Sequence, residues 1–207
     1  MHLFAHFSRF CAEIGGNMKR NIAIFASGNG TNAENIIRYF QDSGRACVGL
    51  VLTNRKSAYV MERARSLNVP SAYMPKEEWE TGDSVLSLLD DKKIDFLVLA
   101  GFLARVPDSI LHAYPDKIIN IHPSLLPKFG GKGMYGDRVH EAVVAAGEKE
   151  TGITIHYINE RFDEGEIIAQ YTCPVLPHET PEEVAAKVHA LEYRYYPQVI
   201  DKLVTEL

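Results

Sequence analysis

Short apolar runs alternate with segments of helical composition along the chain from Asn21 onward. The apolar runs have the length and composition of strands, so we predict a strand at each of them. They are Ile22–Ala26, Val48–Leu52, a weaker candidate at Ser71–Met74, Phe96–Ala100, Lys117–Ile121, Ile153–Ile158 and Ile167–Tyr171. Helices are predicted between them at Ala33–Phe40, Tyr59–Leu67, Ser84–Asp90, Asp108–Ala113 and Val139–Ala146. A strand followed by a helix is therefore the repeating unit.

This alternation predicts an α/β fold. Strands that alternate with helices pair in parallel and are covered by helices on both faces, so we expect a single Rossmann-like open sheet, mostly parallel. The last two predicted strands have no helix between them and are expected to form an antiparallel pair at the C-terminal end. The 207 residues are 46% apolar, without an internal repeat, linker or charge block, which predicts one domain.

A final helix has a clear start. Thr180 is a suitable N-cap, Pro181 follows in the first turn, and Glu183 completes a capping box. The following turns carry one apolar face, formed by Val184, Val188, Leu191 and Tyr195. Because proline lacks a backbone N–H and its ring collides with the preceding turn, we expect Pro197 to kink or end this helix.

Charge and composition narrow the choice of partners. A net charge of −5 and a pI near 5.9 provide no basic field for nucleic acid, so an anionic ligand has to be held by a local pocket. No apolar run approaches the roughly 20 residues of a membrane-spanning helix. The three cysteines lie far apart without C-x-x-C spacing, which gives no sign of zinc. We expect a cytoplasmic protein that binds small molecules, not nucleic acid or a membrane.

Residues 1–18 match no folded element and no targeting signal. They lack an early basic segment, a long apolar stretch and a small-residue cleavage site, so a signal peptide is not predicted. We expect a leader that is either disordered or the product of a start codon set too early. In the second case Gly15-Gly16 is a translated ribosome-binding site and Met18 is the true start. The folded domain is expected at residues 19–207.

A glycine-rich loop, Ser27–Asn32, joins the first predicted strand to the first predicted helix. At such a junction, free backbone N–H groups and the helix dipole form an anion site. The loop also fits the G-x-G-x-x-A pattern of dinucleotide-binding proteins. The acidic residue expected about 20 residues later is missing, because Thr53-Asn54-Arg55-Lys56 follows the second strand. Arg55 leaves NADP as an alternative, and a tight turn that binds nothing is another.

The fifth strand in the chain carries the strongest chemical signal. Asn120 and His122 are two residues apart, so their side chains lie on the same face, and Pro123 and Pro127 end the strand beyond them. Open α/β sheets form ligand sites at the carboxyl ends of their strands. An Asn amide can stabilise an oxyanion and a His can move a proton, which suits acyl transfer. A hydrogen-bonded structural histidine is the plain alternative.

Other motifs join this pair. The sequence reads Asn-Ile-His-Pro-Ser-Leu-Leu-Pro at 120–127, Ala-Gly-Phe at 100–102, Phe-Asp-Glu-Gly at 162–165 and Ser-Gly-Asn-Gly-Thr-Asn at 27–32. With these motifs the chain resembles the folate-dependent formyltransferase family over about residues 20–205. The loop at 27–32 is most similar to the members that formylate glycinamide ribonucleotide in purine synthesis, so the resemblance implies that reaction.

The resemblance implies catalytic roles for three residues. Asn120 and His122 are expected to stabilise the oxyanion that forms when the substrate amine attacks the formyl carbon of 10-formyltetrahydrofolate, the implied co-substrate. Asp163 is expected to hold the imidazole of His122 and to favour its charged form, as a nearby anion does. The implied mechanism needs no metal.

Binding residues are implied in the same way. The substrate phosphate is expected at Gly30, Thr31 and Asn32, and the ribose hydroxyls at Glu192. The folate site is expected to be formed by Leu103, Ala104, Arg105, Val106 and Asn120, with the loop 159–163. The family often has an Arg that meets the folate glutamate tail, and its nearest match is Lys76. The plain alternatives are a half-exposed helix position for Glu192 and core packing for Leu103 and Val106.

Some features depart from the family or leave alternatives open. The loop 129–136 is glycine-rich and longer than expected. His140, His156 and His178 have no metal-site spacing and are interpreted as surface or structural residues. Among other formyl-folate enzymes, methionyl-tRNA formyltransferases need a further C-terminal domain and formyltetrahydrofolate deformylases an N-terminal regulatory one, and we expect neither here. A binding module without chemistry is a further alternative. The oligomeric state is expected to be monomer or homodimer.

Overall fold

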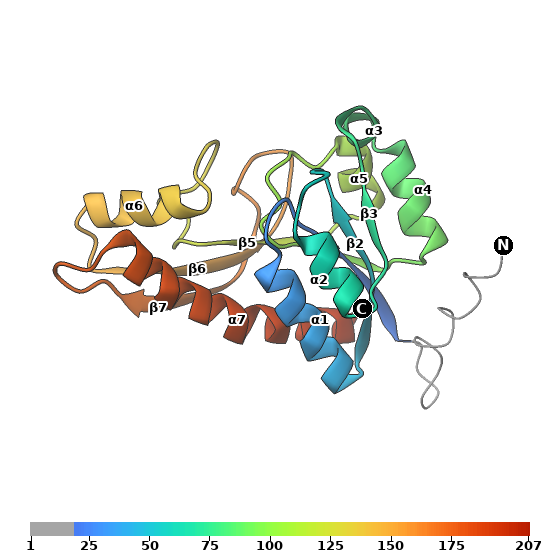
Figure 1. The fold of residues 1–207 in the computed structure, drawn as a ribbon. Helices are drawn as coiled ribbons and strands as arrows, with labels where there is room; N and C mark the ends of the chain where they lie inside the picture. Colours follow the sequence, from blue (N-terminus) through green and yellow to red (C-terminus); the bar gives the residue numbers. More distant parts are fainter. Residues whose placement is uncertain (1–18) are drawn as a thin grey trace.

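The computed structural model describes residues 19–207, and the expectations for the leader lie outside them. A seven-stranded sheet crosses the molecule in the order β3-β2-β1-β4-β5-β6-β7 (Figure 1). Its strands are β1 (Arg20–Phe25), β2 (Ala46–Thr53), β3 (Ser71–Tyr73), β4 (Phe96–Leu99), β5 (Ile118–His122), β6 (Glu150–Tyr157) and β7 (Ile167–Pro174). Every predicted strand is present, and the weak candidate, β3, is three residues long.

Strand directions confirm a mostly parallel sheet with an antiparallel end. β1 runs parallel to β2 and β4, β2 to β3, and β4 to β5. β6 runs antiparallel to β5, and β7 antiparallel to β6. The register places Asn120 opposite His156 and His122 opposite Thr154. Because paired residues on neighbouring strands share a face of the sheet, β6 adds its own polar side chains beside those of β5.

Helices cover both faces of the sheet. They are α1 (Thr31–Ser43), α2 (Val60–Ser66), α3 (Lys76–Thr81), α4 (Asp83–Asp91), α5 (Asp108–Ala113), α6 (Asp137–Ala145) and α7 (Pro181–Glu206). α1, α2 and α7 pack on one face, and α3, α4 and α5 pack on the other (Figure 1). α6 lies against α7. None of these helices is long and apolar enough to cross a membrane.

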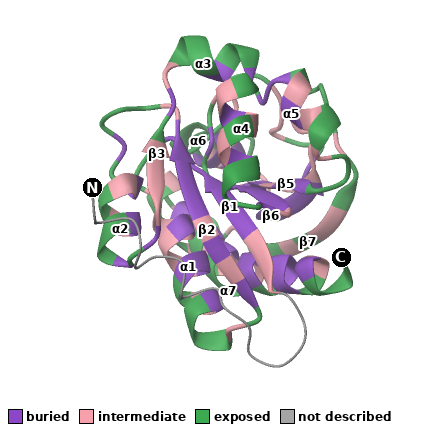
Figure 2. Ribbon diagram, turned by 90° about the vertical axis from the view of Figure 1, so that its right-hand side faces the viewer, coloured by how far each residue is buried: buried purple, intermediate pink, exposed green. Residues whose placement is uncertain are grey.

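β1 shows why both faces have to be covered. Ile22 and Ile24 enter the core formed with α1 and α7, whereas Ala23 and Phe25 enter the core formed with α3, α4 and α5. All four side chains are buried, and β1 lies in the middle of the buried strands in Figure 2. A strand buried on both faces has a continuous apolar sequence, which is why this strand is easy to predict.

α3 is a helix that the sequence pattern did not predict. It is six residues long and buries only Trp79, so it has no apolar period to detect. The Trp79 ring meets Phe25 edge to face, with ring centroids 5.4 Å apart. Its Nε1–H donates to the carbonyl of Arg105 at 2.8 Å. α3 therefore anchors the loop after β4 to the core beneath it.

Pro197 was expected to kink or end the final helix, and the second of these is wrong, because α7 continues through it to Glu206. A proline inside a helix leaves the carbonyl four residues earlier, here that of Tyr193, without its usual donor. The side-chain amide of Asn35 on α1 donates to this carbonyl at 2.8 Å. A neighbouring helix thus supplies the missing hydrogen bond, and α7 carries on. The capping box at Thr180 and Glu183 is formed as predicted.

Candidate active site

A cavity of about 910 Å³ lies at the carboxyl ends of β4 and β5 and at the loop after β1. The chain turns to opposite sides of the sheet after β1 and after β4, so this is the switch point at which open α/β sheets bind ligands. The walls come from the loops 28–32, 101–106, 131–138 and 158–163, with α7 contributing further side chains. Segments far apart in the sequence therefore share one cavity.

Backbone groups form the wall at the start of α1. Gly30 is the N-cap residue, with φ of 77°, and no side chain caps this helix end. The N–H groups of the first turn have no helical acceptor, so they are available to an anion together with the helix dipole. A Cβ on Gly30 would lie 2.4 Å from the Val60 side chain, which restricts this position to glycine. The predicted phosphate residues Gly30, Thr31 and Asn32 all line the cavity.

Two side chains hold this loop in place. The Ser27 hydroxyl donates to Asn54 Oδ1 at 2.7 Å and accepts the backbone N–H of Leu103 at 2.9 Å, which ties the loop after β1 to the loop after β4. Arg63 on α2 donates from Nε to the carbonyl of Asn29 at 2.8 Å. The loop after β1 is therefore held from both sides, by the loop after β4 and by α2.

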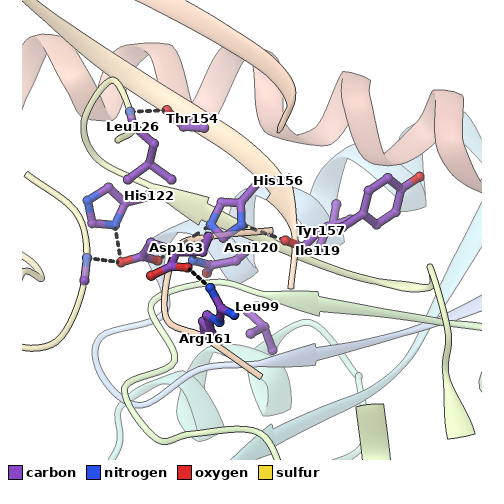
Figure 3. A network of polar contacts seen from close by, with 12 residues as sticks. Leu99, Ile119, Asn120, His122, Leu126, Thr154, His156, Tyr157, Arg161 and Asp163 are labelled. Atoms are coloured by element: carbon purple, nitrogen blue, oxygen red, sulfur yellow. Dashed lines mark hydrogen bonds and ion pairs between the residues drawn. The ribbon is translucent and has the colours of Figure 1, made fainter. Parts of the chain in front are cut away.

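Asn120 meets His156 across the β5–β6 pair (Figure 3). The Nδ1 of His156 lies 2.8 Å from the carbonyl of Tyr157, and since a carbonyl only accepts, Nδ1 carries a hydrogen. The Nδ2 of Asn120 lies 3.3 Å from Nε2 of the same ring. The Asn120 amide is thus held beside His156, and an N–H of its Nδ2 stays available to a ligand in the cavity.

Asp163 lies between the rings of His122 and His156 (Figure 3). Its Oδ2 is 3.5 Å from His122 Nδ1 and accepts the backbone N–H of Gly131 at 2.9 Å. Its Oδ1 is 3.7 Å from His156 Nε2. The structure therefore brings together the three residues that were expected to be catalytic, and it adds a fourth, His156.

The Phe-Asp-Glu-Gly motif has a local reason to place Asp163 there. Asp163 has φ of 57°, in the left-handed region that Asp tolerates better than most residues. Two residues later, a Cβ on Gly165 would lie 1.7 Å from the carbonyl oxygen of Tyr157. Glycine at that position lets the loop pass directly against the end of β6, so the carboxylate of Asp163 reaches the imidazoles.

The loop after β5 turns back onto His122. The Nε2 of His122 lies 2.7 Å from the carbonyl of Phe129, and since a carbonyl only accepts, Nε2 carries a hydrogen. The buried hydroxyl of Thr154 holds the turn by accepting the N–H of Leu126 at 2.9 Å and donating to the carbonyl of Ser124 at 2.7 Å. These bonds hold the turn that brings the Phe129 carbonyl to His122, and that carbonyl sets the tautomer of the imidazole.

Burial and charge act in opposite directions on this pair. Burial lowers the pKa of His122, and the Asp163 carboxylate and the Phe129 carbonyl offset this only in part. Burial also opposes ionisation of Asp163, but His156, His122 and the Gly131 amide together outweigh it and lower the pKa of that carboxyl. Asp163 does favour the imidazolium, as expected, yet burial has the larger effect. His122 therefore rests neutral, with Nδ1 able to accept a proton beside an anion.

Glu192 is buried rather than half exposed, with 5% of its surface accessible. Its Oε2 accepts from Asn32 Nδ2 at 2.9 Å and lies 2.9 Å from Nδ1 of His189. The other polar side-chain atom of Asn32, Oδ1, is buried and has no hydrogen-bond partner within residues 19–207. The residues expected to bind the phosphate and the ribose are thus in direct contact, and an acceptor is left for a ligand hydroxyl.

Apolar side chains contribute at the loop after β4. The expected folate residues Leu103, Ala104, Arg105 and Val106 all line the cavity. Val106 is buried in the core, whereas Leu103 is 41% exposed. The loop 159–163 also lines the cavity, and it includes the exposed Phe162. Apolar walls with few polar groups suit a flat heterocycle.

Comparison with known proteins shows which family has this sequence. The family described as "Formyl transferase" matches residues 20–200. The chain belongs to the formyl transferase family. The phosphoribosylglycinamide formyltransferase of Bacillus subtilis (strain 168) is 37% identical over 89% of this chain and 95% of its own length. The chloroplastic phosphoribosylglycinamide formyltransferase of Arabidopsis thaliana is 38% identical, over 94% of this chain and 70% of its own length.

Solved structures agree with the family. The crystal structure of phosphoribosylglycinamide formyltransferase from Bacillus halodurans superposes with a TM-score of 0.80 at 39% identity, covering 89% of this chain and 95% of that one. The Rossmann-like fold predicted for this formyltransferase is therefore shared with solved members of its family.

One expected folate residue of this formyltransferase does not reach the cavity. Lys76 begins α3, its side chain is 79% exposed, and it pairs with Glu80 at 3.5 Å. It is absent from the cavity wall, because the unpredicted helix α3 turns it to the solvent. The cationic side chains that do line the cavity, apart from its histidines, are Arg105, Lys132, Arg138 and Arg161.

Two of the three histidines that were interpreted as surface or structural residues lie in the cavity wall of the formyltransferase. His156 and His140 are each 1% exposed, whereas His178 is on the surface as expected. His156 could have been found from the antiparallel pairing of the predicted strands, which places a residue of the second strand beside Asn120. His140 carried no such signal, because its place depends on the packing of α6 against α7.

The dinucleotide alternative loses its support. The side chain of Asn54 accepts a hydrogen bond from Ser27, and Arg55 does not line the cavity. Neither residue is therefore placed to bind a ribose or its 2′-phosphate. Among residues 19–207, no group of three or more His, Cys, Asp and Glu side chains is arranged to hold a metal ion.

Proposed function

We propose that this enzyme transfers the formyl group of 10-formyltetrahydrofolate to the primary amine of 5-phosphoribosylglycinamide, a step of purine synthesis. The observation that carries the proposal is the content of the cavity: an uncapped helix N-terminus, a buried carboxylate and an Asn-His-Asp trio share it. Relatives named for this reaction align over most of the chain and support the choice of substrates.

Each part of the substrates has a matching wall. The phosphate binds the amides of Gly30, Thr31 and Asn32, and the ribose hydroxyls bind Glu192. The folate lies against residues 103–106 and the loop 159–163, with its formyl group near Asn120. Both ligands are small molecules, which agrees with the absence of a basic surface field.

The reaction proceeds by addition and elimination. The amine nitrogen attacks the formyl carbon, and the carbonyl electrons move to the oxygen, which the free N–H of Asn120 stabilises. The Nδ1 of His122 takes a proton from the attacking nitrogen, and the Asp163 carboxylate stabilises the resulting imidazolium. As the bond between the formyl carbon and folate N10 breaks, His122 returns that proton to N10. The products are the formylated amide and tetrahydrofolate.

Purified protein with phosphoribosylglycinamide and a 10-formyl folate tests the proposal, by following the deformylated folate spectroscopically. We expect turnover that depends on the ribonucleotide and a product that carries the formyl group. The same assay without the ribonucleotide is the control, because a deformylase transfers the formyl group to water and releases formate without any amine. Formate release that does not depend on the amine, or formylation of methionyl-tRNA instead, overturns the proposal.

A further inference from the structure

One buried histidine of the cavity has no part in this mechanism. His140 on α6 is 1% exposed and lines the cavity. Its Nδ1 is buried, and it has no hydrogen-bond partner among residues 19–207. Buried polar atoms are nearly always paired, because an unpaired one loses its hydration without compensation. An unpaired imidazole in a cavity wall therefore points to a partner that the ligand supplies.

The surroundings of His140 place it between the two ends of the proposed ribonucleotide site. From α7 it is faced by Glu192 and by His189, whose ring centroid is 6.0 Å from its own. From β5 it is influenced by His122, and from its own helix by Asp137. His140 therefore lies in reach of the charges of both the proposed ribose carboxylate and the catalytic imidazole. The arm of the substrate that joins the ribose to the reacting amine has to cross this region.

We propose that His140 contacts the primary amine of the ribonucleotide and takes the proton that this amine must lose before it attacks. The inference rests on the proposed function. An amine of this type has a pKa of about 8, so near pH 7 it is mostly an ammonium without a lone pair. The N–H bond of the ammonium breaks, its electron pair stays on the amine nitrogen, and the proton binds a ring nitrogen of His140. The proton leaves to water after turnover.

His140 suits this step better than the other histidines of the cavity. The Nε2 of His156 lies against Asn120 and Asp163, whereas His122 faces Asp163 and Phe129. His189 is held by Glu192, which raises its pKa and favours the charged form that cannot accept. Burial lowers the pKa of His140, and the neighbouring His189 adds to that effect. His140 is therefore neutral when the substrate arrives.

The pH profile of kcat/KM for the ribonucleotide tests this inference in His140→Ala and His140→Gln. Without the base, only free amine reacts, so the acidic limb moves up to the pKa of the substrate. The loss against the unchanged enzyme is then about tenfold at pH 7, it grows at lower pH for as long as His140 stays neutral, and it disappears above pH 8. His140→Gln retains a hydrogen-bond acceptor but cannot take a proton, so the same shift is expected with a smaller change in KM.

Matched controls separate this role from a structural one. His178→Ala removes an exposed histidine and should leave the profile unchanged. Thermal unfolding shows whether each variant folds, and a folded His140→Ala that loses activity equally at every pH overturns proton acceptance. A His140→Gln enzyme whose pH profile keeps the acidic limb of the unchanged enzyme also overturns proton acceptance by His140. In both cases the proposed function still holds if the unchanged enzyme shows turnover that depends on the ribonucleotide. If the unchanged enzyme shows no such turnover, the proposed function itself is refuted.

Discussion

The two parts of the sheet contribute to the cavity in different ways. In the parallel part, the loops beyond β1 and β4 form the wall, with backbone groups in the first turn of α1 after Gly30 and apolar side chains such as Leu103 after β4. In the antiparallel part, β5 and β6 place their own side chains in the wall, among them Asn120, His122 and His156. We therefore propose that the loops beyond β1 and β4 mainly bind the substrates, whereas strand side chains act in the reaction together with Asp163 from the loop after β6.

Burial explains this difference. Both faces of β1 are covered by helices, and its residues from Ile22 to Phe25 are all buried and apolar, so no polar side chain can be placed there. β5 and β6 have the cavity on one face, where the partly exposed Asn120 lies opposite the buried His156. There a polar residue finds partners on the neighbouring strand. We therefore expect substitutions in the parallel part to change KM and those in the antiparallel part to change kcat.

The largest effect is expected for the side chains of β5. His122→Ala should lower kcat by about 10²–10⁴, because it removes the group that moves the proton. Asn120→Ala should lower kcat by about 10²–10³, because it removes a donor to the oxyanion. The KM of both substrates should change little, since these interactions are used mainly in the transition state. Steady-state kinetics with each substrate varied in turn measures the split. If these two variants instead raise KM at unchanged kcat, the parallel and antiparallel parts of the sheet do not differ in their effects on binding and on catalysis.

A smaller effect is expected for Asp163, which acts through His122. Asp163→Asn retains the shape but removes the anion that counteracts burial, so the pKa of His122 should fall further below its ordinary value. NMR titration of the imidazole signals measures this, with the His122→Ala spectrum identifying the resonance. The rate should fall as well, because the imidazolium formed during the reaction is less stable.

Non-additivity shows whether the two residues work as one unit. The double variant His122→Ala/Asp163→Asn should be scarcely slower than His122→Ala alone. Independent, multiplying losses would show that Asp163 acts elsewhere, in the folate loop or in holding Gly131.

The same division decides what could be predicted from the sequence. The strands of the parallel part are continuous apolar runs, and the loop after β1 has a glycine pattern with a local meaning, so both were predicted. Asn120 and His122 were found because one strand carries them two residues apart. His156 was missed because its role depends on pairing between strands, and His140 because its role depends on the packing of two helices. Lys76 was misplaced since α3 has no apolar period.

The smallest effect is expected in the loop after β1, where two neighbouring glycines differ. A Cβ on Gly28 meets nothing within 4 Å, so Gly28→Ala should fold normally and only crowd the anion site. The KM for the ribonucleotide should rise by about tenfold or less, which corresponds to about 1.4 kcal/mol, while kcat and the KM for the folate stay unchanged. Gly30→Ala is the contrast, because φ of 77° and the contact with Val60 strain any side chain there, and thermal unfolding should show lost stability as well. If Gly28→Ala instead lowers kcat at unchanged KM, the loop takes part in the chemistry and the parallel part does more than bind.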